Sequence, residues 1–275
     1  MKYGFVLPFG DVHEVVEMAA LSESAGWDGF FVWEPVWGLD AWVCLAAAAT
    51  QTARIRLGTM ITPVSRMRPW KLAGETMSVD RLSHGRVILS VGLGAVDTGF
   101  EQFGEVMDKR TRAELLDEGL AILTGLWQGQ PFQFSGKHYQ IEPTEFMPPP
   151  PPIQQPRIPI WVVGAWPFEK SMQRVLRYDG LLPNVLDENR QHRPVTPQDL
   201  KEMVAYVTEH REAKTPFDFV IEGTTPGDDP AGVEAILHPW QAAGATWWIE
   251  AMWSVPRDDE GREQVRQRLV AGPPQ

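Results

Sequence analysis

The sequence alternates short apolar segments with longer segments of helical character eight times, and this alternation limits the fold more than any other feature. Alternating strands and helices are typical of βα units built around a parallel sheet. Eight such units in 275 residues match a closed (β/α)8 TIM barrel, whose eight strands are surrounded by eight helices. The pattern therefore predicts an α/β chain with a single barrel domain over residues 1–275.

Apolar runs and turn residues give approximate bounds for these elements. The expected strands are Tyr3–Leu7, Gly29–Trp33, Ile55–Ile61, Arg86–Val91, Pro159–Val163, Asp179–Leu182, Phe217–Glu222 and Thr246–Ala251. The expected helices are Asp11–Ala25, Leu39–Thr52, Pro69–Leu82, Arg110–Trp127, Phe168–Arg177, Gln198–Ala213, Ala231–Ala243 and Glu260–Val270. Asp11 is the expected N-cap of the first helix, Gly26 its stop, and Pro69 a first-turn residue of the third helix.

The alternation stops between the fourth and fifth units, where residues 131–157 form an expected insertion. Pro131–Glu142 is typical of a β-hairpin with its turn at Ser135-Gly136. The unbroken prolines Pro148–Pro152 favour an extended polyproline connector, and a separate recognition motif is the alternative. Since no shift in composition marks a second domain, we expect the hairpin and connector to belong to the barrel domain.

The charge balance limits the partners of the chain. Its 25 Lys and Arg against 36 Asp and Glu give a formal net charge of −11, whereas nucleic acids and anionic membranes bind clustered cations. No apolar run reaches the ~18 residues of a transmembrane helix, and the N-terminus lacks the apolar region of a signal peptide. We therefore expect a cytoplasmic protein that acts on a small molecule, with neither nucleic acid nor a membrane as partner.

The sequence lacks the motifs of several kinds of functional site. The single cysteine, Cys44, excludes an internal disulfide and a zinc site with several thiolates. No pair among the six histidines has the HxxxH or HExxH spacing, so we expect no metal. No GxSxG motif is present, and Gly92-Leu93-Gly94 is not a GxGxxG motif because position 97 is Asp97.

One long stretch, ARIRLGTMITPVSRMRPWKLAGETMSVDRLSHGRVILSVGLG (Ala53–Gly94), resembles the luciferase-like monooxygenase family. The resemblance extends through Phe103–Trp127, the GKHY of the hairpin and Pro156–Gly164, and covers most of the chain. The family consists of barrel enzymes that use FMN or the deazaflavin coenzyme F-420. The segments RIRLGT and RPWKLA resemble the deazaflavin branch more closely.

The resemblance implies that the coenzyme contacts a bulge after the third strand, glycine-containing junctions after the fourth and fifth strands, and an arginine of the long helix. In the family the bulge often has a cis peptide bond that does not precede proline, and the other groups lie near the phosphate or ribityl chain. The corresponding positions here are Thr59, Met60, Ile61, Gly92, Leu93, Gly94, Arg112, Gly164, Ala165 and Trp166. The structural alternatives are core packing for Met60, a surface charge for Arg112 and rim packing for Trp166.

The second strand departs from the family pattern, because Glu34-Pro35 stands where the family often has an acid followed by histidine. Proline has neither a side-chain proton nor a backbone N–H to donate. Glu34 can act as an acid or a base if burial raises its pKa, and a structural role is the alternative. The reaction type therefore stays open between hydride transfer and monooxygenation.

Aromatic residues near the ends of the expected strands predict the wall of a substrate pocket. These residues are Phe5, Trp33, Trp37, Trp248 and Trp253. The leading hypothesis is a flavin- or deazaflavin-dependent oxidoreductase for a small organic substrate, and the family resemblance suggests a homodimer. The alternatives are a barrel that binds flavin without catalysis, and a phosphate-binding lyase or isomerase that uses no redox coenzyme.

Overall fold

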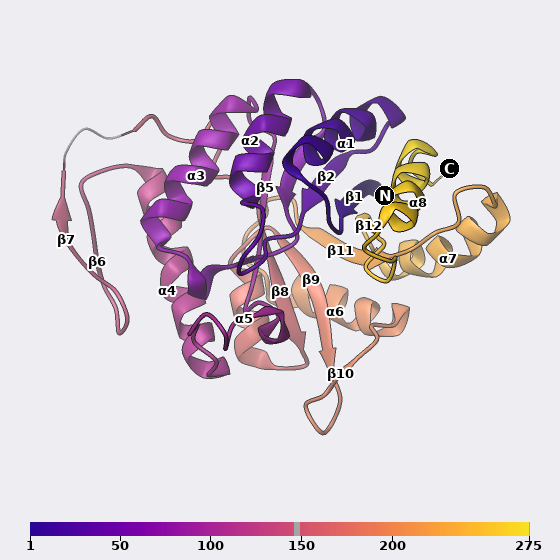
Figure 1. The fold of residues 1–275 in the computed structure, drawn as a ribbon. Helices are drawn as coiled ribbons and strands as arrows, with labels where there is room; N and C mark the ends of the chain where they lie inside the picture. The colour runs from indigo at the N-terminus through magenta and orange to yellow at the C-terminus, as the bar shows by residue number, and fades with distance from the viewer. Residues whose placement is uncertain (146–148, 275) are drawn as a thin grey trace.

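The computed structural model describes residues 1–145 and 149–274 and shows a closed barrel of parallel strands with helices outside it (Figure 1). The ring of strands runs β1, β2, β3, β5, β8, β9, β11 and β12, and β12 pairs with β1 to close it. The strands are β1 (Lys2–Leu7), β2 (Gly29–Val32), β3 (Arg56–Thr59), β5 (Val87–Gly92), β8 (Ile160–Trp166), β9 (Gly180–Leu186), β11 (Asp218–Gly223) and β12 (Trp247–Ala251). The helices are α1 (Val12–Ala25), α2 (Ala41–Gln51), α3 (Pro69–Leu82), α4 (Lys109–Gln128), α5 (Glu169–Leu176), α6 (Pro197–His210), α7 (Pro230–Ala243) and α8 (Asp259–Val270). The predicted (β/α)8 barrel is thereby confirmed.

Two apolar layers hold the barrel together, one inside the ring of strands and one between the strands and the helices. The inner layer includes Phe31, whose ring centroid lies 5.5 Å from that of Trp161 and 6.3 Å from that of Trp247. The outer layer includes Phe30, which is fully buried and belongs to the larger core cluster. Because successive side chains of a strand point to opposite faces, strands covered on both faces are apolar at nearly every position.

Three expected signals at helix ends are confirmed. The Asp11 carboxylate accepts hydrogen bonds from the amides of His13 and Glu14 at 2.7 and 3.0 Å, which caps α1, and Gly26 ends α1 with a φ of +95°. Pro69 begins α3. The expected helix Leu39–Thr52 starts later, at Ala41, because the Asp40 carboxylate caps it by accepting from Val43 N at 2.9 Å.

The structure corrects the ends of three expected strands. The third strand ends at Thr59 instead of Ile61, and a two-residue strand, β4 (Thr62–Pro63), follows and pairs with β5. The fifth strand extends to Trp166, where the β8–β9 pairing continues to Val185. The sixth strand extends to Leu186 because β10 (His192–Arg193) folds back and pairs with it in antiparallel register, which the sequence pattern did not indicate.

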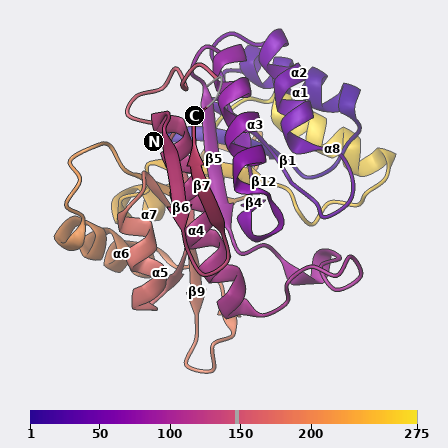
Figure 2. The ribbon, with the colours of Figure 1, turned by 90° about the vertical axis from the view of Figure 1, so that its left-hand side faces the viewer.

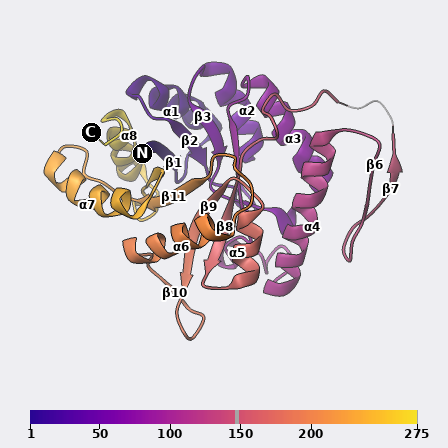
Figure 3. The same cartoon turned by 180° about the vertical axis from the view of Figure 1, so that it is seen from behind.

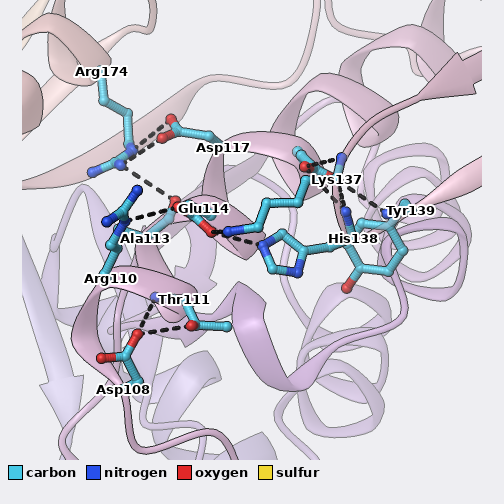
Figure 4. A network of polar contacts seen from close by, with 11 residues as sticks. Asp108, Arg110, Thr111, Ala113, Glu114, Asp117, Lys137, His138, Tyr139 and Arg174 are labelled. Carbon is cyan, nitrogen blue, oxygen red and sulfur yellow. Dashed lines mark hydrogen bonds and ion pairs between the residues drawn. The ribbon is translucent and has the colours of Figure 1, made fainter.

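The expected hairpin forms from β6 (Phe132–Ser135) and β7 (Gln140–Thr144) and lies beside α4 (Figure 2), but its turn lies at residues 136–139 and not at Ser135-Gly136, because Ser135 pairs with Gln140 in the strands. Its turn is held by a carboxylate of α4, because Glu118 accepts hydrogen bonds from the amides of Lys137, His138 and Tyr139 at 2.8 to 3.0 Å. Hydrogen bonds from the side chains of Lys137 and His138 also hold the pKa of Glu114 at about 2 (Figure 4).

The proline-rich connector returns the chain from the hairpin to β8. Residues 146–148, which include the first proline of the expected run, lie outside the described residues. Further along, the buried Asp80 of α3 accepts hydrogen bonds from Ile153 N at 2.7 Å and from Gln154 Nε2 at 2.7 Å. The connector is therefore fixed to the barrel at its C-terminal end, as a structural connector would be.

The two ends of the described chain meet across α1 and α8 (Figure 3). Arg262 and Arg266 of α8 form ion pairs with Glu14 and Glu17 of α1 at 2.5 and 2.6 Å. The indole of Trp27 donates a hydrogen bond to the Leu269 carbonyl oxygen at 2.8 Å. Closure of the barrel therefore depends on contacts between residues about 240 positions apart.

Candidate active site

A bulge follows β3 at the C-terminal end of the barrel, the end at which barrel enzymes place their active sites. The peptide bond between Met60 and Ile61 is cis, as the resemblance implied. The hydroxyls of Thr59 and Thr62 lie 2.9 Å apart and connect the two sides of the bulge. Thr59 is fully buried and Met60 belongs to the inner layer, whereas Ile61 is only partly buried. Of the three predicted contact residues, Ile61 is thus the most accessible to a ligand.

Glu34 lies behind this bulge. Its carboxylate accepts a hydrogen bond from the Thr62 hydroxyl, and the Arg66 guanidinium donates to its carbonyl oxygen at 3.3 Å. Burial raises the pKa of Glu34 to about 7, although the hydrogen bond from Thr62 and the charge of Arg66 act in the opposite direction. The contacts give Glu34 a part in holding the bulge, and its action as an acid or base stays a prediction.

The Gly92-Leu93-Gly94 turn is held by the arginine predicted to lie near it. Arg112 of α4 donates from Nη1 to the carbonyl oxygens of Leu93 and Gly94 at 2.7 and 3.3 Å. Gly94 has a φ of +79°, and a Cβ there would approach Phe100 to 2.7 Å. A Cβ at Gly92 would meet Ile61 at 2.5 Å. Both glycines therefore permit close packing within the protein, in addition to any approach of a ligand.

Two arginines beside this turn retain unused binding capacity. The guanidinium groups of Arg66 and Arg112 each lie 5.7 Å from the centre of the Phe100 ring. Within the described residues neither arginine forms an ion pair, and the Nε of each is buried without a hydrogen-bond partner. Burial lowers the pKa of Arg112. Arginines without an ion pair fit an anionic group such as a phosphate.

The junction after β8 makes contacts within the protein at all three of its predicted site residues. The Ala165 amide already donates to the Ser171 hydroxyl at 2.8 Å. The Trp166 ring packs on Tyr206 of α6 with 5.7 Å between the centroids, as the packing alternative describes. A Cβ at Gly164 would meet Leu181 of β9 at 2.4 Å and Val175 of α5 at 3.0 Å, so this glycine lets α5 pack close to the sheet. The Ala165 amide is thus already used within the protein, and phosphate contacts of Gly164 and of the Trp166 backbone stay predictions.

Two of the five predicted pocket aromatics face the wrong layer. Phe5 is fully buried against Trp27, with 5.3 Å between the ring centroids, and Trp248 is 2% exposed in the layer between strands and helices. Their side chains alternate with those of the inner layer, so the predicted pocket role is wrong for both.

The other three aromatics lie at the C-terminal rim. Trp33 follows β2 directly, and the Arg257 guanidinium lies 5.8 Å from the centre of its ring. Trp37 is 81% exposed. Trp253 donates from its indole nitrogen to the Glu222 carboxylate at 3.0 Å. These positions are open to a ligand, and their contact with substrate stays a prediction.

The structure adds Glu222, near the C-terminal end of β11, to the candidate site residues. It lies on the inner side of β11, two residues after Val220 of the inner layer. The carboxylate is open to solvent from the rim, yet the surrounding protein raises the pKa of Glu222. Arg66 was missed, because its position in the sequence gives no sign of the contact with Phe100.

The other strand-end carboxylate, Glu250, faces away from the rim. It is fully buried and accepts hydrogen bonds from the Thr225 amide at 2.7 Å and from Arg268 at 3.2 Å. In the described part of the chain, no group of three or more His, Cys, Asp or Glu side chains could hold a metal ion. None of the described helices is both long enough and apolar enough to cross a membrane.

Fold and site together define a TIM-barrel protein with two arginines free of ion pairs within the described residues and a bulged third strand at its C-terminal rim. The chain belongs to the luciferase-like monooxygenase family, whose model matches residues 1–269. The family predicted from the sequence is thereby confirmed.

Named relatives fit the predicted class of flavin- or deazaflavin-dependent oxidoreductases. The chain is 32% identical over 123 residues to the flavin-dependent trigonelline monooxygenase oxygenase component of Acinetobacter baylyi, covering 45% of this chain and 33% of that protein. It is 30% identical over 182 residues to the F420-dependent glucose-6-phosphate dehydrogenase of Nocardia farcinica, covering 61% of this chain and 50% of that protein. The chain thus spans half or less of the length of these two relatives.

Solved structures agree on the fold. The F420-dependent tetrahydromethanopterin reductase of Methanopyrus kandleri superposes with a TM-score of 0.76 at 16% identity, covering 98% of this chain and 97% of that one. The monooxygenase RslO1 of Streptomyces bottropensis gives a TM-score of 0.76 at 20% identity, covering 98% of each chain. At these identities the likeness concerns the barrel alone.

Proposed function

We propose that this protein is an oxidoreductase that binds FMN or the deazaflavin coenzyme F-420 at the C-terminal rim of the barrel and acts on a small organic substrate. The observation that supports the proposal most strongly is the pair of arginines, Arg66 and Arg112, which lie beside Phe100 and form no ion pair within the described residues. An anionic group of the coenzyme would pair with their charges. The family assignment favours this proposal over a lyase or isomerase without a redox coenzyme.

The coenzyme supplies the redox chemistry, so the protein needs mainly to bind, orient and shield. Arg112 keeps the Leu93 and Gly94 carbonyls in place and offers its remaining donors to an anionic group. Thr59, Thr62 and Glu34 form a hydrogen-bonded chain that fixes the bulge, and Ile61 presents the accessible side chain of that bulge.

Two carboxyl groups are available to hold a proton, which matters because Pro35 replaces the histidine of the family pattern. Desolvation by the surrounding protein raises the pKa of both Glu34 and Glu222. Glu222 lies on the inner side of β11 and accepts from the Trp253 indole, so its Oε atoms are the better placed to exchange a proton with a substrate at the rim. Glu34 is the second candidate, behind the bulge.

Reconstitution tests the proposal and separates its two reaction types. The purified protein is loaded with each coenzyme, its absorption spectrum is recorded, and oxygen consumption is followed after anaerobic reduction and mixing with air. We expect one coenzyme to stay bound through gel filtration. In the presence of a candidate substrate, oxygen uptake without release of an equal amount of hydrogen peroxide indicates monooxygenation, and oxidation of the reduced coenzyme by that substrate without oxygen indicates hydride transfer. A spectrum without either coenzyme contradicts the proposal.

We also propose that residues 1–275 form one barrel domain, with residues 131–157 inserted, that works as a homodimer in the cytoplasm without nucleic acid. The net charge of −11 supports the last point, because nucleic-acid binding relies on clustered cations. Light scattering after gel filtration is expected to give twice the monomer mass of 30.9 kDa. A monomer mass at micromolar concentration contradicts the dimer.

A further inference from the structure

An apolar cavity lies beside the barrel rim, between the loop after β1 and the loop after β2. Its volume is about 150 Å³. The strand ends contribute Leu7 and Val32 to its wall, and the helices α1 and α2 contribute Val15, Ala41 and Cys44. This cavity contains none of the groups assigned above to the anionic part of the coenzyme.

The chemistry of the wall restricts what can enter. None of the residues that line the cavity is an Asp, Glu, Lys, Arg or His. Burial raises the pKa of the Cys44 thiol, so this group stays uncharged near neutral pH. A charged ligand would lose its hydration without gaining a partner, whereas an apolar one gains from burial.

The size of the cavity fits one ring. A closed apolar cavity of about 150 Å³ stays free of water and accepts benzene. This cavity has a similar volume but opens to solvent, so a longer hydrocarbon chain or a fused ring system would extend out of it. The occupant that fits is therefore a single six-membered ring or a compact hydrocarbon group of similar volume.

Two tryptophans connect the cavity with the rim. Trp33 lines the cavity and follows β2 directly, where Arg257 lies 5.8 Å from its ring centre. Trp37 also lines the cavity, yet 81% of its surface is exposed. The exposed indole continues the apolar surface of the cavity outward, where a ligand would cover it.

We propose that this cavity is a substrate subsite for an uncharged monocyclic apolar group, carried by the molecule whose reactive part meets the coenzyme at the rim. The proposal rests on the proposed function, because the bound molecule is a substrate only if the protein is an oxidoreductase. Binding of the ring itself needs no coenzyme. Val15 and Ala41 lie on opposite helices of the wall and decide how large a group is accepted.

Cys44 provides the test because it is the only cysteine of the chain and lines the cavity. The rate at which methyl methanethiosulfonate modifies Cys44 is measured in the coenzyme-free protein, with and without saturating benzene. We expect benzene to slow the reaction at least fivefold. In Ala41→Leu, whose added carbons fill the cavity, we expect less than a twofold effect. Val15→Phe fills it from the other helix and replaces Ala41→Leu if that variant does not fold.

The matched control moves the thiol out of the cavity. In the variant Cys44→Ala/Val43→Cys, the cysteine lies one position earlier in α2. Position 43 is 61% exposed and does not line the cavity, so benzene should not change the rate at which this cysteine is modified. Equal rates with and without benzene in the unchanged protein overturn the proposal, as does equal protection in the filled variants. Because no coenzyme is present, failure here is distinct from failure of coenzyme binding.

Discussion

Glu34 carries a carboxyl group on which burial and hydrogen bonding act in opposite directions. Burial dominates, so the folded protein holds this proton up to a pH of about 7, against an ordinary pKa of 4.5. Between these two values the folded state binds more protons at this site than the unfolded state does. Ionisation of Glu34 therefore lowers the free energy of unfolding as the pH rises through this window, by ~3 kcal/mol in total.

The variant Glu34→Gln removes this ionisation and is expected to flatten the pH dependence. Urea unfolding at pH 5 and pH 8 measures the change in free energy for both proteins. We expect the unchanged protein to lose ~3 kcal/mol more than Glu34→Gln between these pH values. Glu101→Gln, at an exposed position, is the control and should follow the unchanged protein. Parallel pH profiles for Glu34→Gln and the unchanged protein would show that Glu34 is ionised throughout.

Arg112 is the residue whose charge most directly supports coenzyme binding. Replacing it by methionine removes hydrogen bonds to a charged group, each worth roughly 1.5–3 kcal/mol. We expect the dissociation constant of the coenzyme in Arg112→Met to rise about 10- to 100-fold in a fluorescence titration. Arg110→Met is the control, because the exposed Arg110 pairs with Glu114 and lies on the same helix. An unchanged affinity in Arg112→Met places the anionic group elsewhere.

At the scale of elements, the hairpin depends on α4 for the position of its turn. Glu118 accepts from three consecutive hairpin amides, so Glu118→Ala leaves those donors to water. We expect the amides of residues 137–139 to exchange hydrogen at least tenfold faster in this variant, followed by mass spectrometry. Glu142→Ala, at an exposed position in β7, should leave their exchange unchanged. Exchange in Glu118→Ala as slow as in the unchanged protein would show that other contacts fix the turn.

The positions of the helices and strands were largely predictable from local signals. Which side chains of each strand point into the barrel was not predictable in this way. Asp11, Gly26 and Pro69 mark helix ends through hydrogen bonds and backbone preferences that need only neighbouring residues. In a closed barrel both faces of a strand are apolar, so the sequence does not tell which side chains point inward. The incorrect placement of Phe5 and Trp248 in the pocket follows from this ambiguity.

The roles of several site residues depend on long-range contacts, which the sequence pattern does not reveal. The candidate bulge residues Thr59, Met60 and Ile61 came from a family resemblance, since nothing in the local pattern marks a bulge. The role of Arg66 depends on its contact with Phe100, more than 30 residues away. The orientation of Trp166 depends on its contact with Tyr206. Such contacts are set by the packing of whole elements, which alternation and composition do not describe.

For the whole molecule, closure of the barrel joins its last strand and helix through a buried ion pair. Glu250 of β12 and Arg268 of α8 lie 3.2 Å apart and are 0% and 8% exposed. We expect Arg268→Met to lower the free energy of unfolding by about 3–5 kcal/mol, because an uncompensated carboxylate stays buried. Urea unfolding measures this free energy. The control Glu250→Leu/Arg268→Met removes both charges, so we expect it to lose less of the free energy of unfolding than Arg268→Met. A larger loss in the double variant contradicts the argument.

The central claim is that the C-terminal rim of this barrel binds a flavin-type coenzyme, and an equilibrium titration tests it most directly. The protein is titrated with FMN and, separately, with the deazaflavin coenzyme F-420, and fluorescence quenching is followed. We predict saturable binding of one of the two with a dissociation constant in the micromolar range or below. The absence of saturable binding for both coenzymes at millimolar concentration would contradict the claim.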